Sequence, residues 1–564
     1  MKLQHATSRW VSTAVAYLIF CPHRACASDG TATSIPVIGH GLHPLDWLII
    51  AIYAVSTIGL GVYFGRRQKS TDEYFVGSGH MNPLLIGVSL FATLLSTISY
   101  LSVPGEAAGK GPVVLLGILT YPIVYVVVAY GLLPVYMKQR VTSAYELLES
   151  QLGLSIRLLG ASMFLLLRLV WMTLLVYLAA KALTVMMGID ATWIPWIVLV
   201  TGLVSVIYTS LGGLRAVVIT DLMQTILLFG GAVLVILTVS WHYGGFGWVP
   251  TTWQPHWDTQ PLFSFDPKTR VTFVGSLVAN AVWFVCTAGG DQTTVQRYMA
   301  TRDVGDARRA LAMQLFVGAA VVTTLTLVGF ALLGYFEVNG GELPDGMQLK
   351  ADADDLFPRY ISYHLPVGIS GLVVAAMFAA AMSSIDSGVN SVTAVVMTDF
   401  LDRFGWKPKT EKGHVLVARS LAFFVGTTVV LGSAYIGYIP GNITAMTNKT
   451  VNLLTAPIFS LFFLALFVRR ASATAAWIGA ISGTVVATII AFSGPIVYWL
   501  HTQFGTDPAV FNVSLIEKIG PASGELWTTC EDPISFQWIG LASLVVSLAM
   551  GLVATVVFPR RSTP

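Results

Sequence analysis

The segment 366–398 carries the sequence Ala379-Ala-Ala-Met-Ser-Ser-Ile-Asp-Ser-Gly-Val-Asn-Ser391 inside an otherwise apolar run. A run of this length predicts a helix that crosses a bilayer, because about 20 apolar residues span the hydrocarbon. At helical spacing, small and polar residues form one stripe: Ala380, Ser383, Ser384, Ser387 and Asn390. Asp386 lies beside the stripe, and an intramembrane carboxylate is usually paired or lines a wet pathway. Close helix packing would explain any single serine here.

The composition places the whole chain in a membrane. Of its 564 residues, 55% are hydrophobic and only 11% are charged, against about 25% charged in soluble domains. A net charge of +3 gives no reason to expect a nucleic-acid partner. We predict thirteen spans, near 46–65, 83–104, 112–136, 157–185, 192–211, 218–241, 271–290, 310–337, 366–398, 419–437, 446–468, 472–498 and 536–558.

Basic residues set the predicted orientation of these spans. With the N-terminus outside, most of the 32 lysines and arginines fall in the cytoplasmic connections, Arg297 among them. This bias is the positive-inside pattern and predicts an N-out, C-in chain. The long connections 242–270, 338–365 and 499–535 are then external. Only residues 558–564 follow the last span, so we expect no cytoplasmic catalytic or signalling domain there.

The N-terminus resembles a secretory signal. Lys2 and Arg9 precede an apolar run, and Ala25-Cys26-Ala27 follows it, which is the charged, apolar, small-x-small order of a cleavable signal peptide over 1–27. A short uncleaved anchor is the alternative. Either one leads the chain into the first span from outside.

The spans divide into two units of opposite orientation. Five spans at 83–241 begin inside and end outside, whereas five at 271–468 begin outside and end inside. Such a pair is an inverted repeat, with binding expected near the midplane on the first span of each unit. The span 46–65 is then an extra N-terminal helix, and 472–558 holds two extra C-terminal spans.

A second hydroxyl-rich segment lies in the second span. The hydroxyls there are Ser89, Thr93, Ser96, Thr97, Ser99 and Ser102. Neutral hydroxyls and freed backbone carbonyls can replace the water around Na⁺ and still release the ion. The sequence has no CxxC and no histidine pair for a softer metal.

Four motifs resemble the sodium:solute symporter family, which includes sodium-coupled glucose, iodide, multivitamin and sialic-acid symporters. The strongest match is Gly212-Gly-Leu-Arg-Ala-Val-Val-Ile-Thr-Asp-Leu-Met-Gln224. The others are Thr71-Asp-Glu-Tyr-Phe-Val-Gly-Ser-Gly79, Asp291-Gln-Thr-Thr-Val-Gln-Arg-Tyr298 and the stretch around Ser383. The resemblance implies an all-α, LeuT-type 5+5 inverted-repeat fold and sodium-coupled alternating access.

The resemblance also implies ligands for one sodium ion. They are the carbonyls of Ala92, Leu95 and Ala380 and the hydroxyls of Ser383 and Ser384. The second span must then be broken near 92–96, although no Gly or Pro there demands it.

A second cation site or ion path is implied near Asp221, the acidic residue of the strongest motif. Ser387 matches a serine that binds a second sodium in sialic-acid-type relatives, but Asp386 stands where another serine is expected. That difference leaves open a stronger cation site, proton coupling or a structural acid. Asp221 has an alternative role as a helix N-cap.

The solute is less well specified. Arg168 lies deep in the fourth span and indicates a planar anion such as a carboxylate. A structural ion pair, for example with Asp386, is the alternative. Ser96, Ser99, Phe284 and Thr287 face the expected cavity by register. Gly318 replaces the lysine of galactose-type relatives, which argues against that mode of hexose binding.

These observations predict a symporter rather than an enzyme. We expect it to import an organic carboxylate or acidic sugar, such as a sialic acid, with one or two Na⁺ ions. A neutral-sugar symporter and a transporter-like receptor are the alternatives. The expected partners are a small solute and the lipid bilayer of the cell (inner or plasma) membrane, with a monomer as the functional unit.

Overall fold

The protein is mainly helical in its described part. A computed structural model describes residues 42–66, 68, 70–138, 141–187, 189–259, 261–339, 343, 349, 352–436, 443–519 and 526–560. The predicted signal peptide, 1–27, lies outside these residues. The helices are α2 (Pro44–Gly65), α3 (Thr71–Val76), α4 (Pro83–Leu94), α5 (Thr97–Lys110), α6 (Tyr121–Val126), α7 (Leu133–Tyr136), α8 (Glu146–Leu152), α9 (Leu154–Met187), α10 (Ile194–Tyr243), α11 (Phe273–Gly290), α12 (Gln292–Met299), α13 (Val304–Val338), α14 (Ala353–Tyr363), α15 (Ile369–Val395), α16 (Glu411–Ile436), α17 (Ile443–Phe467), α18 (Ala473–Ala491), α19 (Ser493–Phe504) and α20 (Trp538–Val557).

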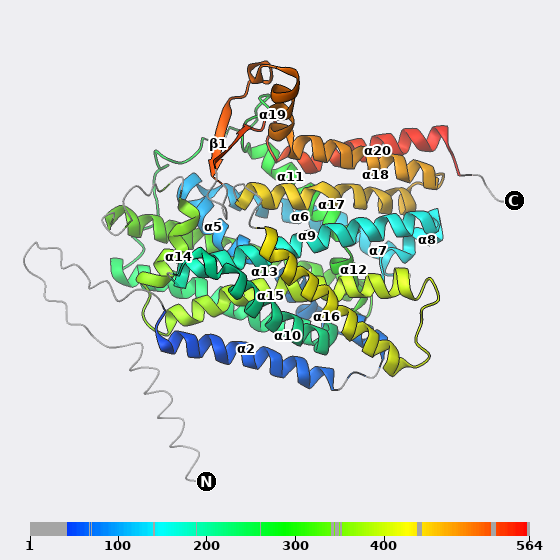
Figure 1. The fold of residues 1–564 in the computed structure, drawn as a ribbon, viewed down its shortest axis with the longest axis horizontal. Helices are drawn as coiled ribbons and strands as arrows, with labels where there is room; N and C mark the ends of the chain where they lie inside the picture. Colours follow the sequence, from blue (N-terminus) through cyan, green and yellow to red (C-terminus); the bar gives the residue numbers. More distant parts are fainter. Residues whose placement is uncertain are drawn as a thin grey trace, which may run out of the picture. The chain divides into compact units, whose positions relative to one another are not determined.

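The described part also contains short segments of 3₁₀ or π helix. They are η1 (Gly77–Gly79), η2 (Pro112–Thr120), η3 (Val127–Leu132), η4 (Ala191–Trp193), η6 (Val396–Leu401) and η7 (Pro508–Phe511). Together, η2, α6, η3 and α7 form one apolar segment over Pro112–Tyr136. Strands β1 (Leu515–Ile519) and β2 (Leu526–Cys530) pair antiparallel, and they project beside α19 from one side of the bundle (Figure 1).

Eleven helices of the described residues are long and apolar enough to cross a membrane, or twelve if the bent pair α4–α5 is one span. Helix α10 contains the two predicted spans 192–211 and 218–241 as two helices that meet at a kink. Its backbone leaves the helical region at Gly213, where φ is 57° and ψ is −168°. The predicted span 472–498 is too long, since α18 ends at Ala491 and α19 is a separate helix.

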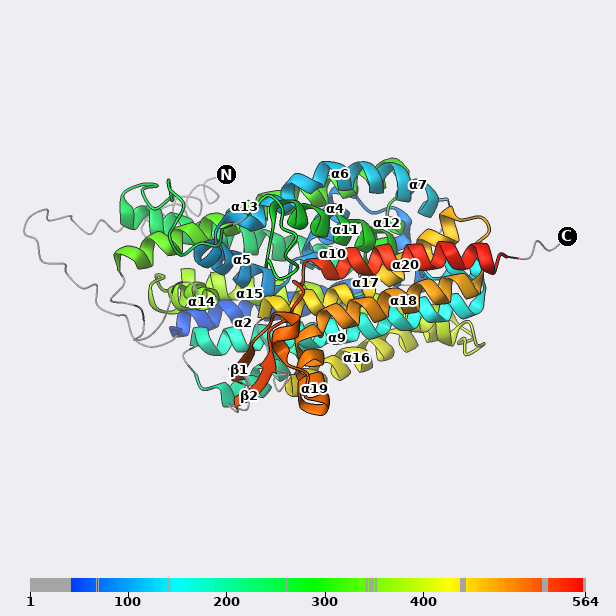
Figure 2. The same cartoon turned by 90° about the horizontal axis from the view of Figure 1, so that it is seen from above.

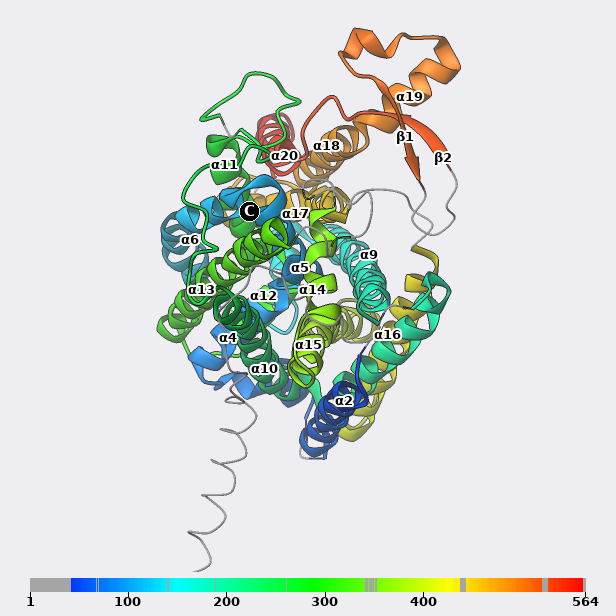
Figure 3. The ribbon, with the colours of Figure 1, turned by 90° about the vertical axis from the view of Figure 1, so that its left-hand side faces the viewer.

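The helices lie side by side with their axes along similar directions (Figure 2). Viewed along these axes, α4, α5 and α12 lie among α9, α10, α13 and α15 (Figure 3). Among the candidate spans of the described part, 83% of the most apolar stretch of α15 is buried inside the protein, whereas for α2 the buried share is only 22%. The serine-rich helix α15 is therefore central, and α2 presents apolar side chains outward, as a lipid-facing helix does.

Glycines let the central helices approach closely. A Cβ at Gly329 of α13 would lie 2.3 Å from the Pro104 carbonyl of α5, and one at Gly87 of α4 would lie 2.5 Å from the Ala310 carbonyl of α13. Backbones in contact at these points fix the position of the broken pair α4–α5 against α13.

Candidate functional site

The second predicted span is broken, as expected. Helix α4 ends at Leu94 and α5 begins at Thr97, with a bend of 70° between them. Leu95 and Ser96 have extended backbone conformations. The Ser96 hydroxyl accepts a hydrogen bond from Ser99 N at 3.3 Å and so caps α5. A serine N-cap inside an apolar run was the local signal for this break, and no glycine or proline is needed.

The break frees backbone carbonyls beside α15. Because the chain leaves the helix here, the carbonyls of Ala92 and Leu95 have no i+4 amide donor. The Ser383 hydroxyl lies 3.0 Å from the carbonyl oxygens of both Ala92 and Ala380. The Ser384 hydroxyl donates to the Leu95 carbonyl at 3.3 Å. The five residues predicted to bind sodium are thus buried together at one point.

This oxygen set fits a sodium ion chemically. All five atoms are neutral oxygens, and the two hydroxyls can turn their hydrogens away from a cation while the carbonyls keep their orientation. Among the described residues, no group of three or more His, Cys, Asp or Glu side chains is placed to hold a metal. The set therefore suits a weakly held monovalent cation better than a transition metal.

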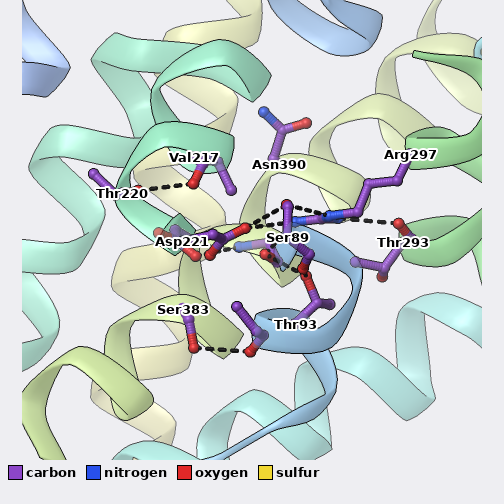
Figure 4. Close-up of polar contacts among 12 residues, drawn as sticks. Ser89, Thr93, Val217, Thr220, Asp221, Thr293, Arg297, Ser383 and Asn390 are labelled. Carbon is purple, nitrogen blue, oxygen red and sulfur yellow. Dashed lines mark hydrogen bonds and ion pairs between the residues drawn. The ribbon is translucent and has the colours of Figure 1, made fainter. Parts of the chain in front are cut away.

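A buried polar cluster lies one turn further along α15, on the α12 side (Figure 4). The Arg297 guanidinium donates from Nε to the Ser89 hydroxyl at 2.8 Å and from Nη2 to the Ser387 hydroxyl at 2.5 Å. Its Nη2 also lies 3.4 Å from Asp221 Oδ2. The Ser89 hydroxyl donates to the same carboxylate, and Thr93 contacts Ser387 at 3.0 Å. Asp221 and Ser387, predicted together from the sequence, do lie together.

The position of Arg297 corrects its assignment to a cytoplasmic connection. Its side chain is fully buried, as is every residue of α12 from Gln292 to Met299. After Asp291 the chain continues as the buried helix α12, so Arg297 pairs with the buried carboxylate of Asp221 and is not an exposed loop residue. The positive-inside pattern counts such a residue as a loop residue. Its place in the motif Asp291–Tyr298 was the available signal.

Asp386 has partners of its own. Its carboxylate accepts hydrogen bonds from the Tyr208 hydroxyl of α10 and from the amide of Ser387 at 2.7 Å. Asp221 Oδ1 has no hydrogen-bond partner among the described residues. Both carboxylates and Arg297 are wholly buried. Among the described residues, Arg297 is ion-paired with Asp221 but not with Asp386, so the two buried carboxylates exceed this one guanidinium, and a further cation or a proton would make the cluster electrically neutral.

A solute-sized cavity of about 350 Å³ lies on the α5 side of the break. Apolar walls with a few amides and hydroxyls are typical of ligand pockets. Its lining includes Ser99, Ser102, Trp171, Asn280, Trp283, Asn452 and Gln537. A neighbouring cavity of about 220 Å³ shares Ser99, Asn280 and Trp283 and adds Phe284 and Gly318. Ser96 lines neither cavity. The asparagines, the tryptophans and Gln537, which directly precedes α20, were missed, because lone amides and aromatic residues in apolar runs give no pattern.

Arg168 borders a third, smaller cavity that shares Trp171 and Trp283 with the first. Its Nη2 donates to Asp291 Oδ2 at 2.6 Å and to the Thr293 hydroxyl at 2.8 Å. The acid paired with Arg168 is therefore Asp291, whereas Asp386 has other partners. Thr287 lines the same cavity.

Comparison with known proteins agrees with this arrangement. The profile of the sodium:solute symporter family matches residues 74–483. The chain belongs to the sodium:solute symporter family. Family members couple the movement of a solute to sodium, so the chain is a sodium-coupled membrane transporter and Na⁺ is its coupling ion.

Individual relatives cover most of the chain. A sodium/sialic acid symporter of Proteus mirabilis is 30% identical over 83% of this chain and 93% of its own length. A sodium-dependent multivitamin transporter of Oryctolagus cuniculus is 28% identical over 82% of this chain and 73% of its own. A solved structure of a Na⁺-coupled sialic acid symporter, substrate-bound and outward-open, has a TM-score of 0.73 and 26% identity, covering 92% of this chain and 99% of that one.

Proposed function

We propose that this symporter imports a small organic carboxylate or acidic sugar, with a sialic acid as the leading candidate. The observation that carries the proposal is the adjacency of two sites at one helix break. The oxygen cluster at Ala92, Leu95, Ala380, Ser383 and Ser384 binds the sodium ion. The 350 Å³ cavity, which Leu94 also lines, takes the solute. An ion that orders the break also orders the wall of the cavity, and this is the basis of coupling.

We infer thirteen spans in a LeuT-type arrangement. Dividing α10 at Gly213 and joining α4 to α5 brings the count to thirteen, N-out and C-in in the inner or plasma membrane. Two inverted repeats, 83–241 and 271–468, are supported by similar breaks in their first spans. The α4–α5 break at Leu95 has its counterpart between α11 and α12, where Asp291 is extended at φ −89° and ψ 119°. The protein works as a monomer.

The Asp221–Ser387 cluster is our candidate for a second cation site. Two observations support it. The buried carboxylates of Asp221 and Asp386 outnumber the buried guanidinium of Arg297. In addition, Asp221 Oδ1 has no hydrogen-bond partner among the described residues. Arg297 already bonds to both Ser387 and Asp221, so a second sodium must displace it or share these oxygens. Asp386 lies beside the cluster and is the candidate for proton coupling.

The choice of a carboxylate rests on Arg168 and on the relatives. The guanidinium of Arg168, in the small cavity next to the solute cavity, matches a carboxylate in shape and charge. Relatives include sialic-acid and multivitamin symporters. A neutral sugar is the second candidate, because the main cavity is lined by amides and tryptophans and Arg168 already has an internal acid.

The ion gradient is sufficient for uphill import. One Na⁺ moving through about 100 mV releases roughly 2.3 kcal/mol, and a tenfold gradient adds about 1.4 kcal/mol. A single sodium therefore supports accumulation of several hundredfold, and a second ion would square that ratio.

Uptake by proteoliposomes tests the proposal directly. The purified protein is given N-acetylneuraminate, biotin, lactate, glucose or galactose under a sodium, potassium or proton gradient. We expect uptake of a carboxylate that depends on the sodium gradient. Equal uptake with potassium or with a proton gradient alone would contradict sodium coupling, and uptake of hexoses alone would contradict the carboxylate assignment.

A further inference from the structure

The ion pair of Arg168 and Asp291 borders the small cavity next to the solute cavity, and Asp291 begins the helix that carries Arg297. Arg168 extends from α9, and Asp291 is the residue between α11 and α12. Both side chains border the small cavity that adjoins the main one. Their 2.6 Å contact lies where a solute carboxylate would meet the guanidinium.

The guanidinium of Arg168 is only partly used. In the described part of the chain, Nη2 alone donates hydrogen bonds, to Asp291 and Thr293. An arginine carries five N–H donors and can bind a carboxylate through two nitrogens at once. The pairing with Asp291 through one nitrogen is therefore weaker than the two-nitrogen pairing available to a solute. The Arg168 stem passes close to Gly388 of α15, where a Cβ would lie 3.5 Å from its Cδ.

Asp291 also controls the start of α12. Its Oδ1 accepts the Thr293 amide at 2.7 Å and caps the helix, while its Oδ2 binds Arg168. Two turns later the same short helix inserts Arg297 between Asp221 and Ser387. The eight-residue α12 thus begins beside the small cavity and carries Arg297 of the cation cluster near its end.

From this geometry we propose that Asp291 is an internal substitute for the solute carboxylate. A solute acid displaces Asp291 from Arg168, and the released α12 withdraws Arg297 from Asp221 and Ser387, which opens these oxygens to sodium. The proposal rests on the carboxylate symport proposed above and adds its specificity switch. Asp291 is then a positioning residue for both sites, and the binding of acid and of sodium favour each other.

The variant Asp291→Asn separates the two functions of this side chain. Asparagine is as good an N-cap as aspartate, so α12 keeps its start. It gives Arg168 no charge to pair with, and a charge-assisted hydrogen bond is about twice as strong as a neutral one. We therefore expect the affinity for N-acetylneuraminate to rise about tenfold or more, with little change for its methyl ester. Asp303→Asn is the matched control, because Asp303 caps α13 in the same way outside both sites.

Sodium binding supplies the second readout. Sodium binding raises the melting temperature of the protein. The sodium concentration that gives half of the maximal rise is measured with and without N-acetylneuraminate. In the wild-type protein the acid should lower this concentration about fivefold or more, the lower range of typical coupling. In Asp291→Asn the half-saturating sodium concentration should already be low without the acid. Adding the acid should then lower it by less than about twofold. Arg168→Gln should lose preference for the acid over its ester.

Two results would overturn the proposal: an affinity in Asp291→Asn no higher than in Asp303→Asn, or an unchanged sodium shift. If the wild-type protein showed sodium-driven uptake of N-acetylneuraminate, biotin or lactate alongside either result, only this inference would fail. Absence of sodium-driven uptake of all three acids would reject the carboxylate function as well.

Discussion

Replacing Ser383 by alanine should raise the sodium requirement of transport by a predictable amount. The Ser383 hydroxyl lies 3.0 Å from the carbonyls of Ala92 and Ala380, so it must exchange a hydrogen bond for the ion. A bond to a charged partner is worth about 1.5–3 kcal/mol and a neutral one about 0.5–1.5 kcal/mol. The net loss in Ser383→Ala is therefore about 1–2 kcal/mol, which corresponds to a five- to thirtyfold rise in half-saturating sodium.

The assay is solute uptake into proteoliposomes at increasing external sodium, with potassium replacing sodium at constant ionic strength. Ser391→Ala is the control, because Ser391 is equally buried on α15 but bonds Gln296 at 2.8 Å, away from the helix break. Its half-saturating sodium should stay within about twofold of the wild-type value. A shift of less than twofold in Ser383→Ala, or an equal shift in both variants, would refute the assignment of the sodium site.

Three further changes test other parts of the structure. Asp221→Asn should alter the sodium dependence of uptake while leaving membrane insertion intact, and normal sodium cooperativity in this variant would contradict its role. Gly213→Val should lower the yield of folded protein in detergent, measured by size-exclusion chromatography, because φ is 57° there and a Cβ would lie 2.8 Å from the Tyr74 carbonyl; wild-type yield would contradict this. Asp354 lies in α14, outside the spans, and its burial raises the pKa to about 6 from 3.8. The folded state therefore binds this proton more tightly than the unfolded state, so stability should fall as the pH rises from about 4 to 6, by up to about 3 kcal/mol; thermal unfolding of Asp354→Asn should lose that part of the pH dependence, and an unchanged profile would refute it.

The sequence predicted the helices best where long apolar runs determine them. The runs that became α2, α9, α13 and α20 were placed within a few residues, because a bilayer requires about 20 apolar residues per helix. Local backbone geometry was harder to predict. The break between α4 and α5 has no glycine or proline to mark it, and the end of α18 at Ala491 lies before the end of the predicted span at 498.

The candidate site could likewise be predicted only in part. Helical spacing placed Ser383 and Ser384 on one stripe of α15, whereas the carbonyls of Ala92 and Leu95 were assigned only by the resemblance to the symporter family. The partners of the buried charges were not readable. Arg297 reaches Asp221 across 76 positions, and Arg168 reaches Asp291 across 123. Such pairings depend on how whole helices pack, and periodicity within one segment carries no information about them.

The membrane potential should fall unevenly across the cavity beside α5 and the packed region around α12. The cavity beside α5 can fill with electrolyte as far as the break, whereas the region around α12 is packed with buried side chains. Little of the membrane potential would then fall along the electrolyte-filled cavity, and most would fall across the packed region around α12, here called the packed half. Moving one elementary charge through 100 mV is worth about 2.3 kcal/mol. Asp221, Asp386 and Arg297 lie in the packed half, so voltage should act mainly on the return of the empty transporter and only weakly on sodium entry.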